Sequence, residues 1–296
     1  MPIVLDHGLR EQISYDLTEF PVVYFCNELA DLGDLTGPIH WHPEFEIATA
    51  TIGALDFQVG TEHVILNPGD SIFVNGNVMH GIRQISEGRA DPVPNIVFTG
   101  SAIAPEDSMI YKKYISPIAC CDELSCVVFN QKSGWHDDVN RMAKSIYQSM
   151  DEKKPCYEMS VQRSLSEIFE RIFSNLDSIP KRHSTRVQIH TQIRIQKMLS
   201  YIYEHYAQAV RLADIADAAN ISRSEAERCF NAYMGMSPVE VLIRYRLQAA
   251  QKLLKTSNLS LQEISSSCGF NSVGYFSRLY RKIYGCAPSS DRFSGK

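Results

Sequence analysis

The last third of the chain contains the same helical pattern twice, and this repeat constrains the fold more than any other feature. Residues 212–238 align with residues 261–288, and Arg228 of the first copy matches Arg278 of the second. Each copy reads as a short apolar helix, a tight turn, and a second helix that opens at a capping residue and stops at Gly before Pro. The repeat therefore predicts two helix-turn-helix units.

Charge is divided unequally between the two parts of the chain. Residues 186–296, which contain the repeat, hold 15 Lys and Arg against 8 Asp and Glu, a balance of +7. Residues 1–185 hold 14 against 26, a balance of −12. A basic module suits phosphate, whereas an acidic region is repelled by DNA. We therefore expect the C-terminal part to bind double-stranded DNA at two adjacent major-groove segments.

Length and composition are those of a folded protein with two domains. The 296 residues are 44% apolar and 21% charged, which is enough to form two cores. The first residues show no basic stretch before an apolar core, and no run approaches the length of a membrane span. We therefore expect a cytoplasmic protein with no membrane partner. The eight cysteines lack the C-x-x-C pairs of a zinc site, so we expect reduced thiols.

The region from residue 45 to residue 98 consists of short β-branched runs separated by turn residues. Gly, Asn-Pro-Gly and Asn-Gly segments lie between the runs, and a further strand is expected at 126–129. Many short antiparallel strands joined by polar turns predict a small barrel or jelly roll. The six runs are 45–52, 55–60, 63–66, 71–74, 80–85 and 95–98.

Helical periodicity follows the strands. Residues 135–150 and 159–176 carry apolar residues at helical spacing, and Pro155 separates them. The apolar stripe of the second helix has two readings: it packs on the barrel, or it forms a two-fold coiled-coil-like dimer contact. Residues 177–190 read as a polar linker, and the chain is expected to be helical from Thr191 onward. These features divide the chain into 1–176, 177–190 and 191–296.

The last hundred residues resemble the AraC/XylS family of transcription regulators. The resemblance implies an all-α DNA-binding domain, an N-terminal domain that binds a small-molecule effector, and more often activation than repression. We also expect a homodimer that contacts RNA polymerase. The residues that carry the resemblance are Leu212, Ile215, Ala216, Ala219, Ile221, Ser222, Phe230, Gly235, the segment 237–250, Leu253, Leu254, Ile264, and the segments 268–270 and 275–285.

Most of the matched positions are expected to be structural. Gly269 precedes the bulky Phe270 and predicts a left-handed or closely packed backbone. The helix at 239–255 should act as a rigid spacer that sets the two second helices about 34 Å apart, one DNA turn. Positions expected to face two small cores are Ile215, Ala219, Ile221, Phe230, Ile264, Phe270, Phe276 and Tyr280.

Contacts with bases are expected from the outward face of each second helix, near its N-terminus. An Arg at position 228 or 278 can pair with guanine, whereas Val273 and Gly274 offer no hydrogen-bonding side chain. The alternative for each charge is a solvated helix face. The expected base-facing residues are Ser224, Glu227 and Arg228 in the first copy and Val273, Gly274, Ser277 and Arg278 in the second.

Phosphate contacts are expected from nearby cations and from the amide groups at helix N-termini. After Phe230, where the family commonly has a basic pair, this chain has Asn231 and Ala232. We therefore expect the first copy to supply more sequence discrimination and the second more anchoring. The expected phosphate contacts are Arg223, Arg281 and Lys282, with the helix starts at Ser222, Ser237 and Ser272.

A second constellation lies upstream. His40, His42 and Glu46 have the spacing His-x-His-x-x-x-Glu, and His80 follows on a distant strand. This pattern resembles the two cupin motifs, whose side chains converge inside a barrel, and we place it just before the first barrel strand. The set suits a borderline metal, although the resemblance implies that regulators of this kind often bind a sugar and need no metal. Three readings stay open: an effector pocket, a metal in that pocket, or a motif that only shapes the strand entry.

Together these features predict a protein of α+β multidomain class. A cupin-like jelly roll with flanking helices, for effector binding and dimerisation, precedes an all-α double helix-turn-helix domain. The predicted function is that of a ligand-responsive transcription regulator without catalytic residues. The alternatives are a cupin metal oxygenase or isomerase with an accessory DNA-binding module, and an architectural DNA-binding protein without a ligand.

Overall fold

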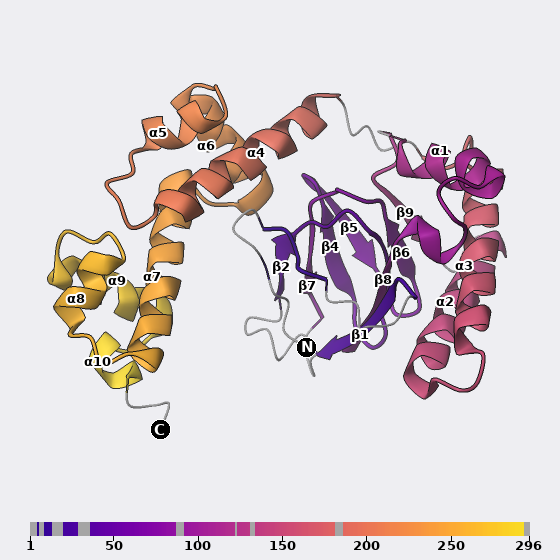
Figure 1. Ribbon diagram of the computed structural model, residues 1–296, viewed down its shortest axis with the longest axis horizontal. Coiled ribbons are helices and arrows are strands. Elements are labelled where there is room, and N and C mark those ends of the chain that lie inside the picture. The colour runs from indigo at the N-terminus through magenta and orange to yellow at the C-terminus, as the bar shows by residue number, and fades with distance from the viewer. Residues whose placement is uncertain are drawn as a thin grey trace. The chain divides into compact units, whose positions relative to one another are not determined.

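The computed structural model describes residues 5, 9–13, 20–28, 36–86, 92–121, 123–130, 134–180 and 186–292. The chain divides into two compact units, an N-terminal unit of residues 1–192 and a C-terminal unit of residues 193–296 (Figure 1). No helix in the described ranges is long and apolar enough to cross a membrane. All eight cysteines are free thiols.

Two antiparallel sheets form the body of the N-terminal unit. Apolar residues of both sheets meet in one cluster between them, among them Phe57 and Leu66 from one sheet and Ile72 from the other. The five-stranded sheet has the order β1 (Val22–Glu28), β8 (Pro92–Phe98), β3 (Phe45–Thr49), β6 (Ser71–Val74) and β9 (Cys126–Phe129). The four-stranded sheet has the order β2 (Thr36–His40), β7 (His80–Gln84), β4 (Leu55–Val59) and β5 (Glu62–Leu66). The predicted jelly-roll class and its seven predicted strands are confirmed.

Strands β1 and β2 are additional to the prediction. β1 pairs with β8 along its whole length at the edge of the five-stranded sheet. β2 contains Gly37 and Pro38, which are depleted in strands and read as turn signals. It nevertheless pairs with β7, with a shift in register between Gly37 and His40. Such irregular edge strands are hard to predict from local sequence.

Two helices cover the outer face of the five-stranded sheet, α2 (Gly134–Glu152) and α3 (Tyr157–Ser174) (Figure 1). Phe169 of α3 packs against Phe45 and Phe73, with ring centroids 5.2 and 5.8 Å apart. β3 is therefore buried on both faces, which explains why it lacks a polar alternation. The stripe formed by Leu165, Ile168, Phe169 and Ile172 is buried within a single chain. The packing reading is confirmed, and the coiled-coil dimer contact through this stripe is wrong.

A short helical connection joins β8 to β9. It consists of a 3-10 turn at Gly100–Ala102, a π-helical segment at Tyr111–Ile115 and α1 (Ser116–Ala119). Ile115 and Ile118 belong to the same core as α2 and α3.

Helices make up the rest of the described chain. α4 begins at Arg186, earlier than the predicted Thr191, so part of the predicted linker is helical, while residues 181–185 lie outside the described residues. α4 also contains the point at which the two units divide. The helices are α4 (Arg186–His205), α5 (Leu212–Ala218), α6 (Arg223–Met234), α7 (Pro238–Thr256), α8 (Leu261–Ser267), α9 (Val273–Tyr284) and α10 (Pro288–Asp291).

The two predicted helix-turn-helix units are confirmed as α5 with α6 and α8 with α9. In each second helix a serine hydroxyl caps the N-terminus: Ser222 accepts from the amide of residue 225, and Ser272 accepts from the amide of residue 275. Gly235 and Gly285 end the helices with φ of +62° and +75°. Local capping therefore fixes equal lengths of 12 residues in both copies.

The turn of the second unit depends on Gly269, as predicted. Its φ is +77°, and a Cβ there would lie 2.5 Å from the carbonyl oxygen of Tyr206 and 2.9 Å from Nε of Arg246. Arg246 donates to the carbonyl oxygens of Tyr206 and Gln208, which ties α7 to the segment after α4. Seven of the eight predicted core residues are buried, and Ile221 is half-buried.

Candidate functional site

The four cupin-motif residues converge between the sheets. His40 ends β2, Glu46 lies in β3, and His80 begins β7, directly opposite His40 in the β2–β7 ladder. The motif therefore spans β2 and β3 instead of preceding the first strand, because β1 and β2 were absent from the prediction. Exposure is 8% for His40, 1% for His42, 4% for Glu46 and 2% for His80. We call these four residues the His/Glu cluster.

The spacing within the His/Glu cluster is that of a small ion site. One ligand atom from each residue lies within 4.8 Å of the others. Oε2 of Glu46 is 2.9 Å from Nε2 of His80 and 3.3 Å from Nε2 of His42. Ligand atoms around a tetrahedral metal with bonds of about 2.1 Å lie about 3.4 Å apart. These atoms therefore leave room among them for an ion and not for a sugar.

Backbone carbonyls fix the orientation of all three imidazoles. A carbonyl oxygen can only accept, so each Nδ1 carries a hydrogen, and each ring directs its Nε2 into the cluster. Carbonyl partners of this kind are typical of metal-ligating histidines. The Nδ1–O distances are 2.8 Å from His40 to Pro38, 3.1 Å from His42 to Glu44 and 2.8 Å from His80 to Val78.

Burial and neighbouring charge define the protonation of the cluster. Burial and the adjacent His80 lower the pKa of His40 to about 3, so its ring is neutral. Burial opposes ionisation of Glu46, but His80 and His42 outweigh it, and the pKa of this carboxyl is lowered. Asn95 donates to Oε1 of Glu46 at 3.0 Å and orients the carboxylate. Nε2 of His80 and Nε2 of His42 both lie within hydrogen-bond distance of this carboxylate, and a bound cation would take the place of these two hydrogen bonds.

Glu11 borders the cluster and was missed by the sequence analysis. Its Oε2 lies 3.5 Å from Nε2 of His40, and burial and the Glu46 charge raise its pKa to about 7. The backbone holds it there, since Glu11 donates to the carbonyl of Trp41 and Trp41 donates to that of Leu9. No spacing motif links Glu11 to His40, so the sequence carried no signal for it.

At the start of α6, the expected DNA-contact residues lie on the surface. Ser222, Arg223, Ser224, Glu227 and Arg228 are all exposed. A hollow of about 530 Å³ lies at this end of the helix, lined by Ala213, Ala216, Asp217, Ile221, Ser222, Arg223 and Ser224. The outward face expected from the repeat is therefore available in the C-terminal unit.

Arg228 is held in an ion pair that the sequence analysis did not consider. Its Nε and Nη2 donate to the two carboxylate oxygens of Glu225 at 2.9 and 2.7 Å. Nη1 of Arg194 lies 3.5 Å from the same carboxylate. The hydrogen bond from Arg228 lowers the pKa of Glu225, so the carboxylate is ionised. Contact with a base therefore requires Arg228 to exchange this partner.

The exposed surface of α9 differs from that of α6 in its charged neighbours. Ser272, Gly274, Arg278, Arg281 and Lys282 are exposed, whereas Val273 and Ser277 are half-buried. Tyr275 stands where the first copy has Glu225. Within the described ranges, no acidic group lies within ion-pair distance of Arg278. Its guanidinium is thus presented to solvent without a competing carboxylate.

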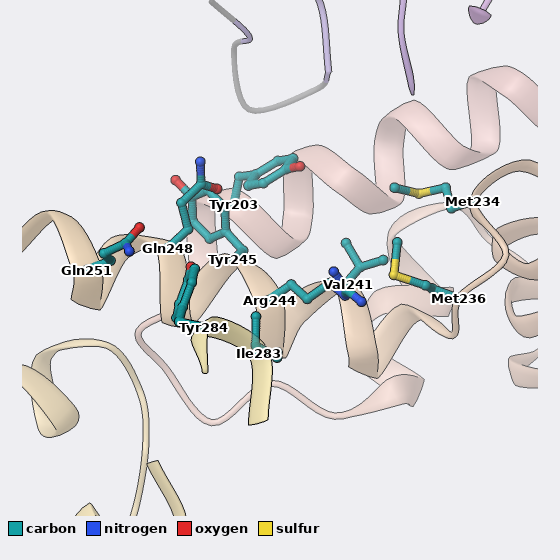
Figure 2. Close-up of a pocket in the computed structure, with 10 residues that line it drawn as sticks. All are labelled: Tyr203, Met234, Met236, Val241, Arg244, Tyr245, Gln248, Gln251, Ile283 and Tyr284. Carbon is teal, nitrogen blue, oxygen red and sulfur yellow. The ribbon is translucent and has the colours of Figure 1, made fainter. Parts of the chain in front are cut away.

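A separate pocket of about 410 Å³ lies beside α7, within the C-terminal unit (Figure 2). Methionines at the end of α6 and the last residues of α9 border it, and Arg244 is its one cationic side chain. None of its residues belongs to the expected DNA contacts. The lining residues are Tyr203, Met234, Met236, Val241, Arg244, Tyr245, Gln248, Gln251, Ile283 and Tyr284.

Comparison with protein families identifies both parts of the chain. Residues 215–292 match the family described as a helix-turn-helix domain, and residues 30–91 match the family described as a cupin domain. The first range contains both helix-turn-helix units, and the second contains the whole His/Glu cluster. The matched families thus coincide with the two sites described above.

Relatives of known sequence are transcriptional regulators. The chain is 26% identical over 289 residues to the uncharacterized HTH-type transcriptional regulator YdeC of Bacillus subtilis, covering 97% of both chains. It is 31% identical to the regulator GbdR of Pseudomonas aeruginosa over 46% of this chain, although it spans only 36% of that one. The solved structure of ToxT from Vibrio cholerae is 15% identical over 92% of this chain and 96% of its own, with a TM-score of 0.39. The chain therefore combines a cupin domain with an AraC-type helix-turn-helix domain, and its relatives are HTH-type transcriptional regulators.

Proposed function

We propose that the protein is a metal-responsive transcription regulator, in which occupancy of the His/Glu cluster by a divalent metal controls binding to promoter DNA. The observation that carries this proposal is the set of three Nδ1–carbonyl hydrogen bonds, which leave three Nε2 atoms and one carboxylate oxygen directed at one another. Three imidazoles and a carboxylate are a ligand set that suits zinc, iron, nickel or manganese. The near-complete burial of all four side chains would shield a bound ion from water.

Each residue of the cluster has a distinct part in this proposal. His40, His42 and His80 bind the ion through Nε2, and Glu46 binds it through Oε2 while Asn95 holds the other carboxylate oxygen. The bound ion would supply positive charge and Lewis acidity to the interior of the unit. We assign the four residues to an ion because their close spacing leaves no room for a sugar among them. A sugar effector, if the protein uses one, would occupy another part of the N-terminal unit.

For DNA, the proposal keeps the expected contacts. Ser224, Glu227 and Arg228 of α6, with Val273, Gly274, Ser277 and Arg278 of α9, face the bases. Arg223, Arg281, Lys282 and the capped N-termini at Ser222, Ser237 and Ser272 bind phosphates. The exposure of most of these side chains supports the assignment, whereas Val273 and Ser277 are half-buried and can contribute only partial contact.

Further parts of the proposal rest on the family. The relatives with similar sequences are transcriptional regulators, and we propose that this chain likewise has no enzymatic activity. We also propose a cytoplasmic homodimer that activates transcription by contacting RNA polymerase. The dimer contact must use surfaces other than the buried stripe of α3.

The metal site is tested with chelator-treated, full-length protein and Co²⁺ as a probe, because the visible absorption of Co²⁺ reports its ligands. We expect one Co²⁺ per chain, displaced by Zn²⁺, and at least a hundredfold weaker binding in His80→Ala and Glu46→Gln. His63→Ala is the matched control, because this exposed histidine pairs with Asp56 on the surface of the four-stranded sheet. Absence of stoichiometric binding, or equal loss in the control, would refute the metal site.

A further inference from the structure

One loop of the N-terminal unit is shared between the His/Glu cluster and helix α4. The loop, residues 75–79, joins β6 to β7 and ends at His80. Its first residue is anchored in the core: the Asn75 side chain donates to the carbonyls of Ile118 and Leu124, and its amide donates to that of Ser125. The start of the loop is therefore fixed, and its conformation is set by what its remaining residues contact.

The middle of the loop touches two members of the cluster. The amide of Asn77 donates to the carbonyl of His42 at 2.7 Å, and the carbonyl of Val78 accepts from Nδ1 of His80 at 2.8 Å. Asn77 has a φ of +62°, and a Cβ on Gly76 would lie 2.4 Å from the carbonyl oxygen of Pro43. The loop thus packs directly on the backbone between His42 and β3, with little freedom to shift independently of these histidines.

The same loop binds α4 through one side chain. Oε1 of Gln192 accepts from the amide of Met79 at 3.2 Å, and its Nε2 donates to the carbonyl of Asn77. These two backbone groups flank Val78, whose carbonyl orients His80. A primary amide that both accepts and donates in this way pairs with a backbone much as a neighbouring strand does. Gln192 is therefore hydrogen-bonded to the loop whose Val78 carbonyl orients His80.

Helix α4 continues without a break from Gln192 into the C-terminal unit. There Ile195, Met198, Leu199 and Ile202 are buried, and Arg194 lies 3.5 Å from Glu225 of α6. A helix transmits a shift of its first turns along its length because its backbone hydrogen bonds are continuous. Whatever sets the position of Gln192 thus acts on a helix that is part of the DNA-binding unit.

We propose that Gln192 is the positioning residue that couples occupancy of the His/Glu cluster to helix α4. A metal bound at Nε2 of His80 fixes that ring, the ring fixes the carbonyl of Val78, and the two hydrogen bonds on either side of Val78 hold the first turns of α4. This inference rests on the proposed function, since it describes how metal binding at the His/Glu cluster would affect helix α4. We call the two hydrogen bonds between Gln192 and the loop the Gln192 clamp. By linkage, if this clamp favours the metal-bound conformation of the loop, it also strengthens metal binding.

The experiment is residue-level hydrogen–deuterium exchange on full-length protein, with and without Zn²⁺, for wild type, Gln192→Ala and Gln196→Ala. Gln196 is the matched control, because it lies one turn later on the same helix and is also half-buried. Without metal, we expect the Met79 amide to exchange about fivefold faster in Gln192→Ala, as loss of one hydrogen bond implies. The control should match wild type, and an unchanged Met79 amide in Gln192→Ala would overturn the clamp.

The zinc arm tests the coupling itself. In wild type and in Gln196→Ala, Zn²⁺ should slow exchange both in residues 75–80 and in the first turns of α4. In Gln192→Ala it should slow exchange only in residues 75–80. Equal protection of α4 in Gln192→Ala and wild type would overturn the coupling, as would zinc binding in wild type without protection of α4. If zinc protects no residue of wild type, the metal site of the proposed function fails, and the Met79 result alone decides whether the clamp exists.

Discussion

The two helix-turn-helix units share a backbone design but differ in the charge around their equivalent arginines. Both second helices have 12 residues, a serine N-cap and a left-handed glycine at the end. On the first, Arg228 is bound by Glu225, whereas on the second, Tyr275 replaces the glutamate and Arg278 has no acidic partner in the described part of the chain. Core packing and capping therefore constrain what is repeated, while the exposed face is free to diverge.

This difference changes which of the two helices we expect to contribute more to the recognition of DNA sequence. From sequence, the first helix was expected to supply more discrimination because it keeps Glu227 and Arg228. In the structure, Arg228 must give up two hydrogen bonds to Glu225 before it can pair with a base. Arg278 needs no such exchange, although its neighbours Val273 and Ser277 are half-buried. We therefore expect the second arginine to contribute more to sequence preference than the first.

The largest effect should come from removing the arginines one at a time. Arg278→Ala should weaken binding to a duplex selected from a random pool by about 1 to 3 kcal/mol and relax preference at one base position. Arg228→Ala should have a smaller effect, because in the wild-type protein Arg228 must break its two hydrogen bonds to Glu225 before it can contact a base. Fluorescence anisotropy on the selected duplex and on single-base variants measures both. A larger loss in Arg228→Ala would reverse the comparison, and equal losses of Arg278→Ala on selected and random DNA would remove its role in base recognition.

A smaller effect is expected from the cations that we propose as phosphate contacts of the second unit. Lys282→Ala should weaken binding to every duplex alike and reduce the slope of log affinity against log salt by about 1. The equivalent position of the first unit is the exposed Ala232, and Ala232→Lys should steepen the slope by a similar amount. Lys144→Ala removes an exposed charge from α2 in the N-terminal unit and serves as the control. A slope in Lys282→Ala identical to that of the control would contradict a phosphate contact.

Turn residues and periodicity were sufficient to predict most of the fold. The seven predicted strands lie between clear turn signals, and the two helix-turn-helix units are marked by caps and glycines. β2 was missed because Gly37 and Pro38 imitate a turn, and its pairing with β7 depends on residues forty positions away. Because β2 was not predicted, the cupin motif was placed before the first strand, whereas His40 lies at the end of β2. Local pattern thus fails where a strand is stabilised mainly by its partner.

For the His/Glu cluster, the sequence supplied the ligands but not their orientation. Spacing was enough to select His40, His42, Glu46 and His80, which do converge. The direction of each imidazole depends on backbone carbonyls, and Glu11 reaches the cluster through bridges to Trp41 and its neighbours, so tertiary structure was required for both. By contrast, the pairing of Glu225 with Arg228 follows a three-residue helical spacing that the sequence displays openly.

The smallest expected effect isolates that pair. Glu225→Gln keeps the size of the side chain and the amide that Ser222 caps, but it releases Arg228 and removes a negative charge from α6. Because an exposed ion pair contributes little, we expect affinity for the selected duplex to rise by about twofold to fivefold. The gain should disappear when Arg228→Ala is also present, since the two changes act through one contact.

The control for this prediction separates the pair from net charge. Glu204→Gln removes the same charge from an exposed position on α4, and it should raise affinity less than Glu225→Gln does. If both variants bind equally tightly, or if Glu225→Gln raises affinity in the Arg228→Ala background as well, then long-range repulsion explains the gain. The two arginines would then differ for a reason other than Glu225, because freeing Arg228 would not have made the first helix behave more like the second.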